Sequence, residues 1–370
     1  MSHTVHSINL QGTVVDDHAV ASEYPGAVIS RTERVRWVDG TFGAGPLTVV
    51  PVQNLIVTSA FTTIDPQARR YFLNQTYADV HHFFGLAPHL DGNKFTFSGD
   101  VNRWPGDYVV LGGPIDGVWH HWLIQWSARL SVLKMLRPDL LENPSVKFLV
   151  DARAWTVPFK EIFEAFGLPE HRFGIVDPGL HHQVPNGYMV SFLDQNYYYP
   201  SVMQNYVETV RAGFDLPAPG AEHPVRLFCS RQGFEIPKRR VANWAEVLPV
   251  LQEFDFTVVE LGSLSAREQF RLFNRAEVVV GVHGADLAGM LFCPPASQLL
   301  IFENERNTYT GLAGTYTTLA SLRGMRSQMM IVEEVVDPSG DYRDFGPQHN
   351  RDYYIDVGQL RRRFERMFRV

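Results

Sequence analysis

The chain has 370 residues, of which 45% are hydrophobic and 20% charged, and its formal net charge at pH 7 is −7. This length is enough for two domains with separate cores, and the composition is ordinary for a soluble globular protein. The acidic balance argues against a protein built mainly to hold nucleic acid, but a local basic pocket for a phosphorylated small molecule is compatible with it. With only two cysteines, Cys229 and Cys293, the chain has neither a disulfide framework nor the CxxC spacing of a metal site.

The sequence carries no signal for export or membrane insertion. Its first residues, MSHTVHSINLQGTVVDD, lack a basic segment followed by an apolar core. No apolar run approaches the roughly 20 residues that a membrane helix needs. We therefore expect a cytoplasmic protein with no integral membrane segment, and peripheral attachment to a membrane stays open.

The first hundred residues mix short β-like runs with turn signals. Residues 47–52 and 54–58 are expected to be strands, and Asp65-Pro66 marks a turn or a helix start. Residues 85–106 are rich in Gly, Pro, Asp and Asn and are expected to be a loop. No chemistry is predicted for this part of the chain.

A helix expected from about residue 117 to 136 follows a predicted strand at 108–111. Its apolar side chains repeat at three- and four-residue steps and form a buried stripe: Trp119, Leu123, Trp126, Leu130 and Leu133. His121, Gln125 and Arg129 recur every four residues and form a second, polar stripe. This polar stripe is either a partly solvated face or one wall of a ligand cleft, with His121 closest to the carboxyl edge of the sheet.

The rest of the first half continues the α/β pattern. Strands are expected at 146–150, 173–176 and 188–192, and helices at 158–166 and 201–211. Gly167 is a C-terminal stop for the first of these helices. The Pro- and Gly-rich tract at 214–224 is the expected domain boundary.

The second half alternates strand and helix cleanly, which predicts a parallel sheet with right-handed crossovers, as in a Rossmann-like domain. Its expected strands are 225–229, 256–260, 277–281 and 298–302, and its expected helices are 243–254, 265–274 with a Ser-x-x-Glu capping box, and one that begins near 285. The tail ends in an amphipathic helix, whose Arg361–Arg363 cluster indicates a solvated face rather than membrane attachment.

Two strand ends in this half carry residues suited to a diphosphate. Arg231 directly follows the first strand, with a basic run at 238–240 a few residues later, of which one or two members are expected to be merely solvated. His283 to Asp286 follow the strand at 277–281 and open a helix. A guanidinium group can bind a phosphate in a bidentate way, through two hydrogen bonds to its oxygens. A glycine-containing turn at a helix N-terminus also attracts anions.

Several common sites are excluded by their missing motifs. The chain has no G-x-x-x-x-G-K-[ST] for a Walker-type site and no G-x-G-x-x-G after a strand for a dinucleotide. It also lacks a D-x-D between apolar strand residues, so a metal-independent site is the simpler expectation and no metal site is predicted. Three His-His pairs, 81/82, 120/121 and 181/182, do not assemble into a metal site by spacing alone.

Three segments resemble glycosyltransferase family 61. The first is GVWHHWLIQWSARL, where His121, Arg129 and Leu130 match the family and Gln125 stands at a position that is often Asp or Glu. The second is SRQGFEIPKRRVANWAEV, with its Ser-Arg start followed by basic residues. The third and most specific is GVHGADLAGMLFCPP, which departs from the family at Asp286, often Gly, and at Gly289, often Asn. The resemblance covers about 107–370, with Glu303 two residues beyond the expected acidic position.

This resemblance implies an α/β fold of GT-B type, with two Rossmann-like domains facing each other across a cleft. Residues 1–215 would form an acceptor-side α/β domain, 216–350 a nucleotide-sugar-binding domain, and 351–370 a C-terminal helix. The implied activity is that of an inverting, metal-independent hexosyl- or pentosyltransferase of polysaccharide biosynthesis. It would have no resident cofactor and would use a nucleotide-sugar co-substrate, expected to be UDP-linked, and a glycan or lipid-linked saccharide as acceptor.

The resemblance also implies roles for single residues. Its candidates for the donor site are Arg231, Arg239, Arg240, His283, Gly284, Ala285, Asp286 and Glu303. His121 is the candidate base, since an imidazole has a pKa near neutrality, and Asp194 is the alternative carboxylate base. Gln125 and Arg129 would support the cleft.

Two other functions remain compatible with the sequence. A glycosyltransferase-like protein that binds a sugar nucleotide or glycan without turnover is motivated by Gln125 at the often acidic position. A metal-dependent hydrolase could be built from the paired histidines.

Overall fold

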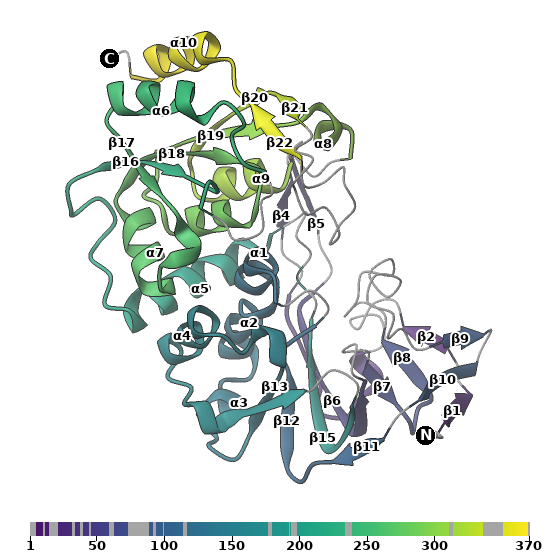
Figure 1. The fold of residues 1–370 in the computed structure, drawn as a ribbon. Coiled ribbons are helices and arrows are strands. Elements are labelled where there is room, and N and C mark those ends of the chain that lie inside the picture. Colours follow the sequence, from purple (N-terminus) through teal and green to yellow (C-terminus); the bar gives the residue numbers. More distant parts are fainter. Residues whose placement is uncertain are drawn as a thin grey trace. The chain divides into compact units, whose positions relative to one another are not determined.

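The computed structural model describes most of the chain from residue 100 onward and shorter stretches before it. The described residues are 5–9, 12–14, 21–31, 34–37, 40–43, 46–58, 63–72, 89–91, 94–98, 100–113, 117–176, 180–191, 193, 198–233, 239–310, 314–335 and 351–368. They form a mixed α/β structure (Figure 1). None of the helices among them is long and apolar enough to cross a membrane.

The chain divides into two compact units. The N-terminal unit comprises residues 1–35, 41–195 and 199–213, and the C-terminal unit comprises 36–40, 196–198 and 214–370. The division into folding domains at 1–215, 216–350 and 351–370 stays a prediction.

The N-terminal unit is built on a sheet in the order β14-β13-β12-β15-β6-β7-β8-β2, with β11 beside β15 and β3 beside β6. The strands are β2 Gly12–Val14, β3 Val28–Ile29, β6 Thr48–Val57, β7 Thr63–Asp65, β8 Arg70–Phe72, β11 Val101–Arg103, β12 Asp107–Val110, β13 Lys147–Asp151, β14 Phe173–Val176 and β15 His181–Val190. Strands β14, β13, β12 and β15 are parallel, and β6 is antiparallel to β15. This parallel part has the chain order 3-2-1-4, as in one half of a doubly wound fold.

The helices of this unit are η2 Ala21–Glu23, α1 Trp119–His121, η4 Trp122–Trp126, α2 Arg129–Leu136, α3 Pro138–Glu142, η5 Ala152–Ala154, α4 Val157–Ala165, η6 Glu170–Arg172 and α5 Pro200–Gly213. A separate sheet of this unit joins β1 Val5–Asn9, β10 Lys94–Ser98 and β9 His89–Asp91. Strand β4 Arg34–Trp37 pairs with β5 Gly40–Gly43, and residues 36–40 of this pair are assigned to the C-terminal unit.

The C-terminal unit holds a five-stranded parallel sheet in the order β17-β16-β18-β19-β20. The strands are β16 Val225–Cys229, β17 Phe256–Val259, β18 Ala276–Val282, β19 Gln298–Glu303 and β20 Arg326–Ile331, and a small sheet pairs β21 Glu333–Val335 with β22 Asp352–Tyr354. The helices are α6 Trp244–Glu253, η7 Leu261–Ser263, α7 Ala266–Asn274, η8 Ala285–Phe292, α8 Glu305–Thr310, α9 Gly314–Leu322 and α10 Val357–Phe368. The sheet order 2-1-3-4-5 confirms the predicted Rossmann-like topology for this unit.

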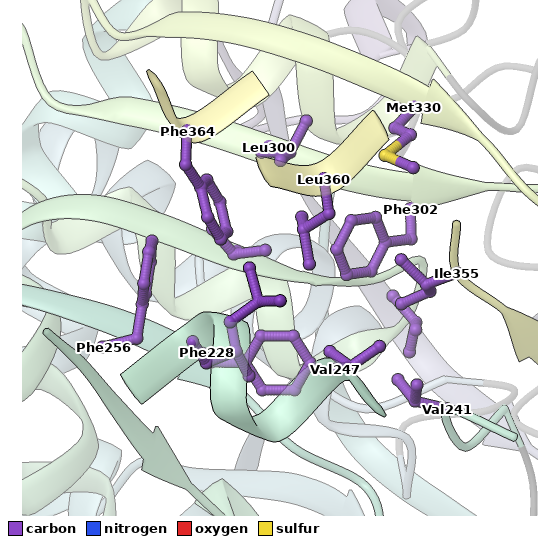
Figure 2. Close-up of a cluster of buried hydrophobic side chains, with 14 of the residues drawn as sticks. Phe228, Val241, Val247, Phe256, Leu300, Phe302, Met330, Ile355, Leu360 and Phe364 are labelled. Atoms are coloured by element: carbon purple, nitrogen blue, oxygen red, sulfur yellow. The ribbon is translucent and has the colours of Figure 1, made fainter. Parts of the chain in front are cut away.

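One face of this sheet is covered by α6 and α10, which lie against each other (Figure 1). Figure 2 shows the resulting core, where Phe228, Leu300 and Phe302 of the strands meet Val247 of α6 and Phe364 of α10. The tail helix is therefore part of this core, because its apolar stripe is buried while the arginines at 361 and 362 stay exposed.

The opposite face is covered by α7 and η8. Alternate strand positions point this way, and a Cβ at Gly281 would lie 3.1 Å from the side chain of Leu287 in η8. Phe270 of α7 stacks on Phe292 of η8 with ring centroids 3.9 Å apart. The predicted capping box at Ser265 and Glu268 is confirmed at the start of α7.

Four expectations for local structure are wrong. The strands predicted at 47–52 and 54–58 are one strand, β6, which continues through Asn54 despite its positive φ of 54°. The region 85–106, expected to be a loop, contains β9, β10 and β11. These strands are short, and β10 and β11 pair with the distant strands β1 and β15, which the local turn residues do not reveal. The strand at 188–192 begins earlier, at His181. The helix expected at 285 has the tighter 3-10 form.

The fifth difference lies in the helix expected at 117–136. It is α-helical only at both ends, and Trp122–Trp126 form a π-helical turn. A π turn widens the backbone ring by one residue, which a helical hydrophobic pattern does not reveal.

Candidate functional site

Two candidate sites can be built, one in each unit. The first lies where the order of the C-terminal sheet reverses, between β16 and β18. Cys229, the last residue of β16, is paired with Gly281 of β18, so the residues that follow these two strands leave the sheet side by side. In open α/β sheets, ligands bind beyond the carboxyl ends of the strands at this switch point.

Arg231 is the central side chain of this site. It is 3% exposed, and its Nε donates a hydrogen bond of 2.6 Å to Oδ2 of Asp286. Its guanidinium lies against Gly284, since a Cβ there would come within 2.5 Å of Nη2. Asp286 therefore orients Arg231, and Gly284 provides the space for it.

Arg239 joins Arg231 at the same place. Its Nη1 donates to the backbone oxygen of His283 at 3.1 Å. Burial and the nearby positive charge of Arg231 lower the pKa of Arg239 to about 10. Two guanidinium groups close enough to disfavour each other's charge make this strand end suited to an anion.

Arg240 has a different environment. Its backbone N–H donates to Oδ1 of Asp352 at 2.8 Å, and its Nη2 donates to Oδ2 at 3.0 Å. The pair ties the loop after β16 to β22, so among the described basic residues of the 238–240 run it is Arg239 that lies with Arg231. Lys238 lies outside the described residues.

His283 is held on three sides. Its backbone N–H donates to the backbone oxygen of Phe302 at 3.0 Å, and its Nδ1 lies 2.6 Å from Oε2 of Glu303. Its ring packs edge-on against Tyr316. Because a carboxylate oxygen accepts, Nδ1 carries a proton. Glu303 is fully buried and its other oxygen accepts the N–H of Asn304, so Glu303 holds His283 in place without reaching the surface itself.

Ala285 follows as the first residue of η8, with Gly284 as its N-cap. The N–H groups of a first helical turn have no partner within the helix and point out of its N-terminus. Ala285 and Asp286 are partly exposed, so this end of η8 lies near the surface beside Arg231.

Sequence reasoning missed two tyrosines of this cluster. Burial raises the pKa of Tyr316, and it raises that of Tyr353 to about 12. Asn304 donates to the hydroxyl of Tyr353 at 3.1 Å. Both come from segments far along the chain from Arg231, and neither has a local motif that would have marked it.

The second candidate site lies in the N-terminal unit, at the π turn. Nδ1 of His121 lies 2.5 Å from Oε1 of Gln125, and Nε2 of Gln125 donates to the backbone oxygen of Leu193 at 2.8 Å. A carbonyl oxygen only accepts, so the amide nitrogen must face Leu193 and the amide oxygen must face His121. Nδ1 of His121 is therefore the donor, and Nε2 carries the lone pair.

The pKa expected for His121 is wrong. Burial lowers it to about 4 rather than leaving it near neutrality. The imidazole is therefore neutral at physiological pH, which is the form that accepts a proton, but with this pKa it is a weaker base than a histidine that titrates near neutrality.

Arg129 is fully buried, and its guanidinium lies 4.6 Å from the ring centroid of Trp126. A Cβ at Gly113 would come within 2.1 Å of the same tryptophan ring, so Gly113 makes room for Trp126. Arg129 thus belongs to the buried packing of this helical segment. Asp194, the alternative base, lies outside the described residues.

The histidines that the structure describes do not come together with other metal ligands. Within the described part of the chain, no group of three or more His, Cys, Asp or Glu side chains is placed to hold a metal ion. His120, His181 and His182 are buried, and His182 packs on Trp104 at 4.2 Å between ring centroids. His81 and His82 lie outside the described residues.

Comparison with known proteins gives one informative match. The glycosyltransferase 61 family model matches residues 119–300, which contain both candidate sites apart from Glu303, the tyrosines and Asn304. No curated protein matches the chain.

Two of the solved structures that resemble the chain can be named, and their likeness to it is weak. One is the iron-containing dodecameric glycosyltransferase TibC from enterotoxigenic E. coli H10407, with 11% identity over 69% of this chain and 75% of that chain, at a TM-score of 0.27. The other is the dodecameric iron-containing heptosyltransferase TibC in complex with ADP-D-beta-D-heptose, with 11% identity over 56% of this chain and 61% of that chain, at 0.25. TM-scores this low support no inference about fold or activity.

The family match confirms the resemblance, since residues 119–300 include the second and third segments and the first from Trp119 onward. A glycosyltransferase needs a sugar donor and an acceptor, and the match includes both the His121 turn and the Arg231 cluster. Residues 119–300 therefore match glycosyltransferase family 61, and the protein is a glycosyltransferase.

Proposed function

We propose that the protein is an inverting, metal-independent glycosyltransferase that moves a hexose or pentose from a nucleotide sugar to a hydroxyl of a glycan or polysaccharide precursor. A UDP-linked sugar is the expected donor, and a free or lipid-linked saccharide is the expected acceptor. The C-terminal unit would bind the donor and the N-terminal unit the acceptor, as in the GT-B architecture.

The observation that carries this proposal is the pairing of Arg231 and Arg239 at the switch point. Asp286 offers one negative charge to these two guanidinium groups, so a positive charge is left over that an anion would offset. A nucleotide diphosphate supplies at least two negative charges, and its oxygens match the planar donors of a guanidinium. The Gly284 turn lets such a group approach the backbone.

The proposed reaction is a single displacement at the anomeric carbon. The acceptor oxygen forms a bond to this carbon while the bond to the nucleotide diphosphate breaks, which inverts the configuration. Arg231 and Arg239 would stabilise the charge that develops on the leaving diphosphate. Nε2 of His121 would take the proton of the acceptor hydroxyl, and Asp194 is the second candidate for this role.

The test combines binding and turnover. Isothermal titration of UDP, ADP, GDP and CDP is compared between the wild type and the variants Arg231→Ala, His121→Ala and Arg362→Ala, the last an exposed control on α10. We expect one nucleotide to bind the wild type and the control, to lose affinity in Arg231→Ala, and to bind His121→Ala normally.

Turnover separates the remaining alternatives. Release of the nucleotide from its sugar, lost in His121→Ala and unchanged by a chelator, would support a metal-independent transferase with His121 as base. Binding of a nucleotide without any transfer or hydrolysis across donor sugars would indicate a binding module instead. Activity abolished by the chelator would overturn metal independence.

A further inference from the structure

Glu260 occupies a strand end next to the proposed diphosphate site. It directly follows β17, the edge strand that pairs with β16. The backbone N–H of Ser230 donates to Val259 at 2.8 Å, so the chain leaving β16 and the chain leaving β17 are joined at this point. Arg231 is the next residue along, and neighbouring strands are only about 4.8 Å apart.

The carboxylate of Glu260 is locked in place by the turn after β16. Its Oε1 accepts a hydrogen bond from the hydroxyl of Ser230 and another from the backbone N–H of Gly233 at 3.2 Å. A Cβ at Gly233 would lie 3.5 Å from Cδ of Glu260, so the turn packs closely on the carboxylate. One oxygen is thus used to hold the side chain in a fixed orientation.

The other oxygen, Oε2, is buried and has no hydrogen-bond partner among the residues that the structure describes. A buried acceptor without a donor is unfavourable, and for a charged group more so than for a neutral one. Oε2 is therefore an acceptor that the fold keeps at this strand end. Holding the turn after β16 requires only Oε1 and does not explain it.

The position matches a rule of one class of doubly wound sheets. In dinucleotide-binding Rossmann domains the phosphates bind at the turn after the first strand, and an acidic residue that follows in the chain accepts a hydrogen bond from a ribose hydroxyl. Here β16 is the first strand of the five-stranded sheet in chain order and β17 the second. We propose that Oε2 of Glu260 binds a ribose hydroxyl of the donor nucleotide, a subsite that rests on the function proposed above.

Glu260→Gln is the informative variant. Because Ser230 and Gly233 both donate, the amide oxygen must take the place of Oε1, and the NH₂ group then takes the place of Oε2. An acceptor becomes a donor with little change in shape. Glu246→Gln, an exposed position on α6, is the matched control, and thermal melts check that each variant is folded.

The experiment measures the affinity of each protein for UDP, 2′-deoxy-UDP, 3′-deoxy-UDP and pyrophosphate, with the other nucleotides used if UDP is not the one that binds. A hydrogen bond to a charged acceptor is worth about 10- to 100-fold in affinity. We expect the wild type and Glu246→Gln to prefer the ribose form over at least one deoxy form by that factor. Glu260→Gln should lose most of this preference and bind pyrophosphate as the wild type does.

The outcomes separate this inference from the proposed function. Equal preference for ribose in Glu260→Gln and the wild type, or no preference in the wild type, would overturn the ribose subsite while leaving the diphosphate site intact. Weaker pyrophosphate binding in Glu260→Gln would also overturn it, because Glu260 would then act by shaping the Arg231 turn. Failure of the wild type to bind any nucleotide would remove the proposed function and the subsite together.

Discussion

The guanidinium of Arg231 occupies the space that a side chain at Gly284 would need, with an added Cβ only 2.5 Å from Nη2. The glycine of this turn is therefore required by its neighbour and not by its own backbone, whose φ of 168° is extended. This contact links the end of β16 to the end of β18, so a substitution at either Arg231 or Gly284 disturbs both strand ends.

Gly284→Ala should weaken nucleotide diphosphate binding by about tenfold or more, because the guanidinium must move and lose its bond to Asp286. Isothermal titration with the nucleotide that binds the wild type gives the measurement. Gly358→Ala on α10 is the control, since its Cβ meets only the flexible side chains of Asp356 and Arg362. Unchanged affinity in Gly284→Ala would show that the placement of Arg231 is not needed for binding.

Glu303→Gln should lower both stability and donor affinity. His283 Nδ1 and the N–H of Asn304 both donate to this carboxylate, so an amide leaves one of them facing its NH₂ group. A buried donor without an acceptor costs about 1–3 kcal/mol. Urea unfolding and nucleotide titration measure the two effects, with the exposed Glu305→Gln as the control. Loss of stability at full affinity would limit Glu303 to a role in folding.

His121 should make the protein less stable as the pH falls from about 6.5 to about 4. The unfolded chain takes up a proton near the ordinary pKa of 6.5, whereas the folded protein resists it down to about 4. The unfolded state binds more protons in this range, so stability decreases on acidification, by at most about 3 kcal/mol.

Urea unfolding of the wild type and His121→Gln between pH 7.5 and 4.5 tests this expectation. The difference between the two proteins isolates His121 from the other titrating groups, and His171→Gln, at an exposed position on η6, is the control. Parallel stability curves for the wild type and His121→Gln would contradict the lowered pKa.

The parts that could be predicted from the sequence are those set by local pattern. The predicted strands 225–229 and 173–176 agree with β16 and β14 to the residue, because short β-branched and aromatic runs between turn signals indicate buried strands. Arg231 and His283 could be singled out because a parallel sheet brings the carboxyl ends of its strands to one edge.

What could not be predicted depends on contacts between distant segments. Glu260 follows an ordinary strand and becomes notable only when Ser230 and Gly233 are seen to hold one of its oxygens. The partner of Glu303 is a histidine 20 positions away, and no spacing rule links them. The π turn at 122–126 could not be predicted either, since its residues are all buried and four of the five are apolar, as in an ordinary buried helix.

Gln125→Glu should raise the pKa of His121 from about 4 towards neutrality. A carboxylate in place of the amide oxygen would lie against Nδ1 and favour the imidazolium. The substitution should also reduce stability by about 1–3 kcal/mol, because the backbone oxygen of Leu193 would face a carboxylate oxygen and lose its donor.

NMR titration of ¹³C-labelled histidine follows the pKa of His121 directly, with the exposed Gln252→Glu as the control. An imidazolium cannot accept a proton, so transfer by Gln125→Glu should fall more steeply between pH 8 and pH 6 than transfer by the wild type. An unchanged pKa would mean that Gln125 does not govern the protonation of His121. A raised pKa with an unaltered pH profile would show that another group acts as the base, and Asp194 is the first candidate.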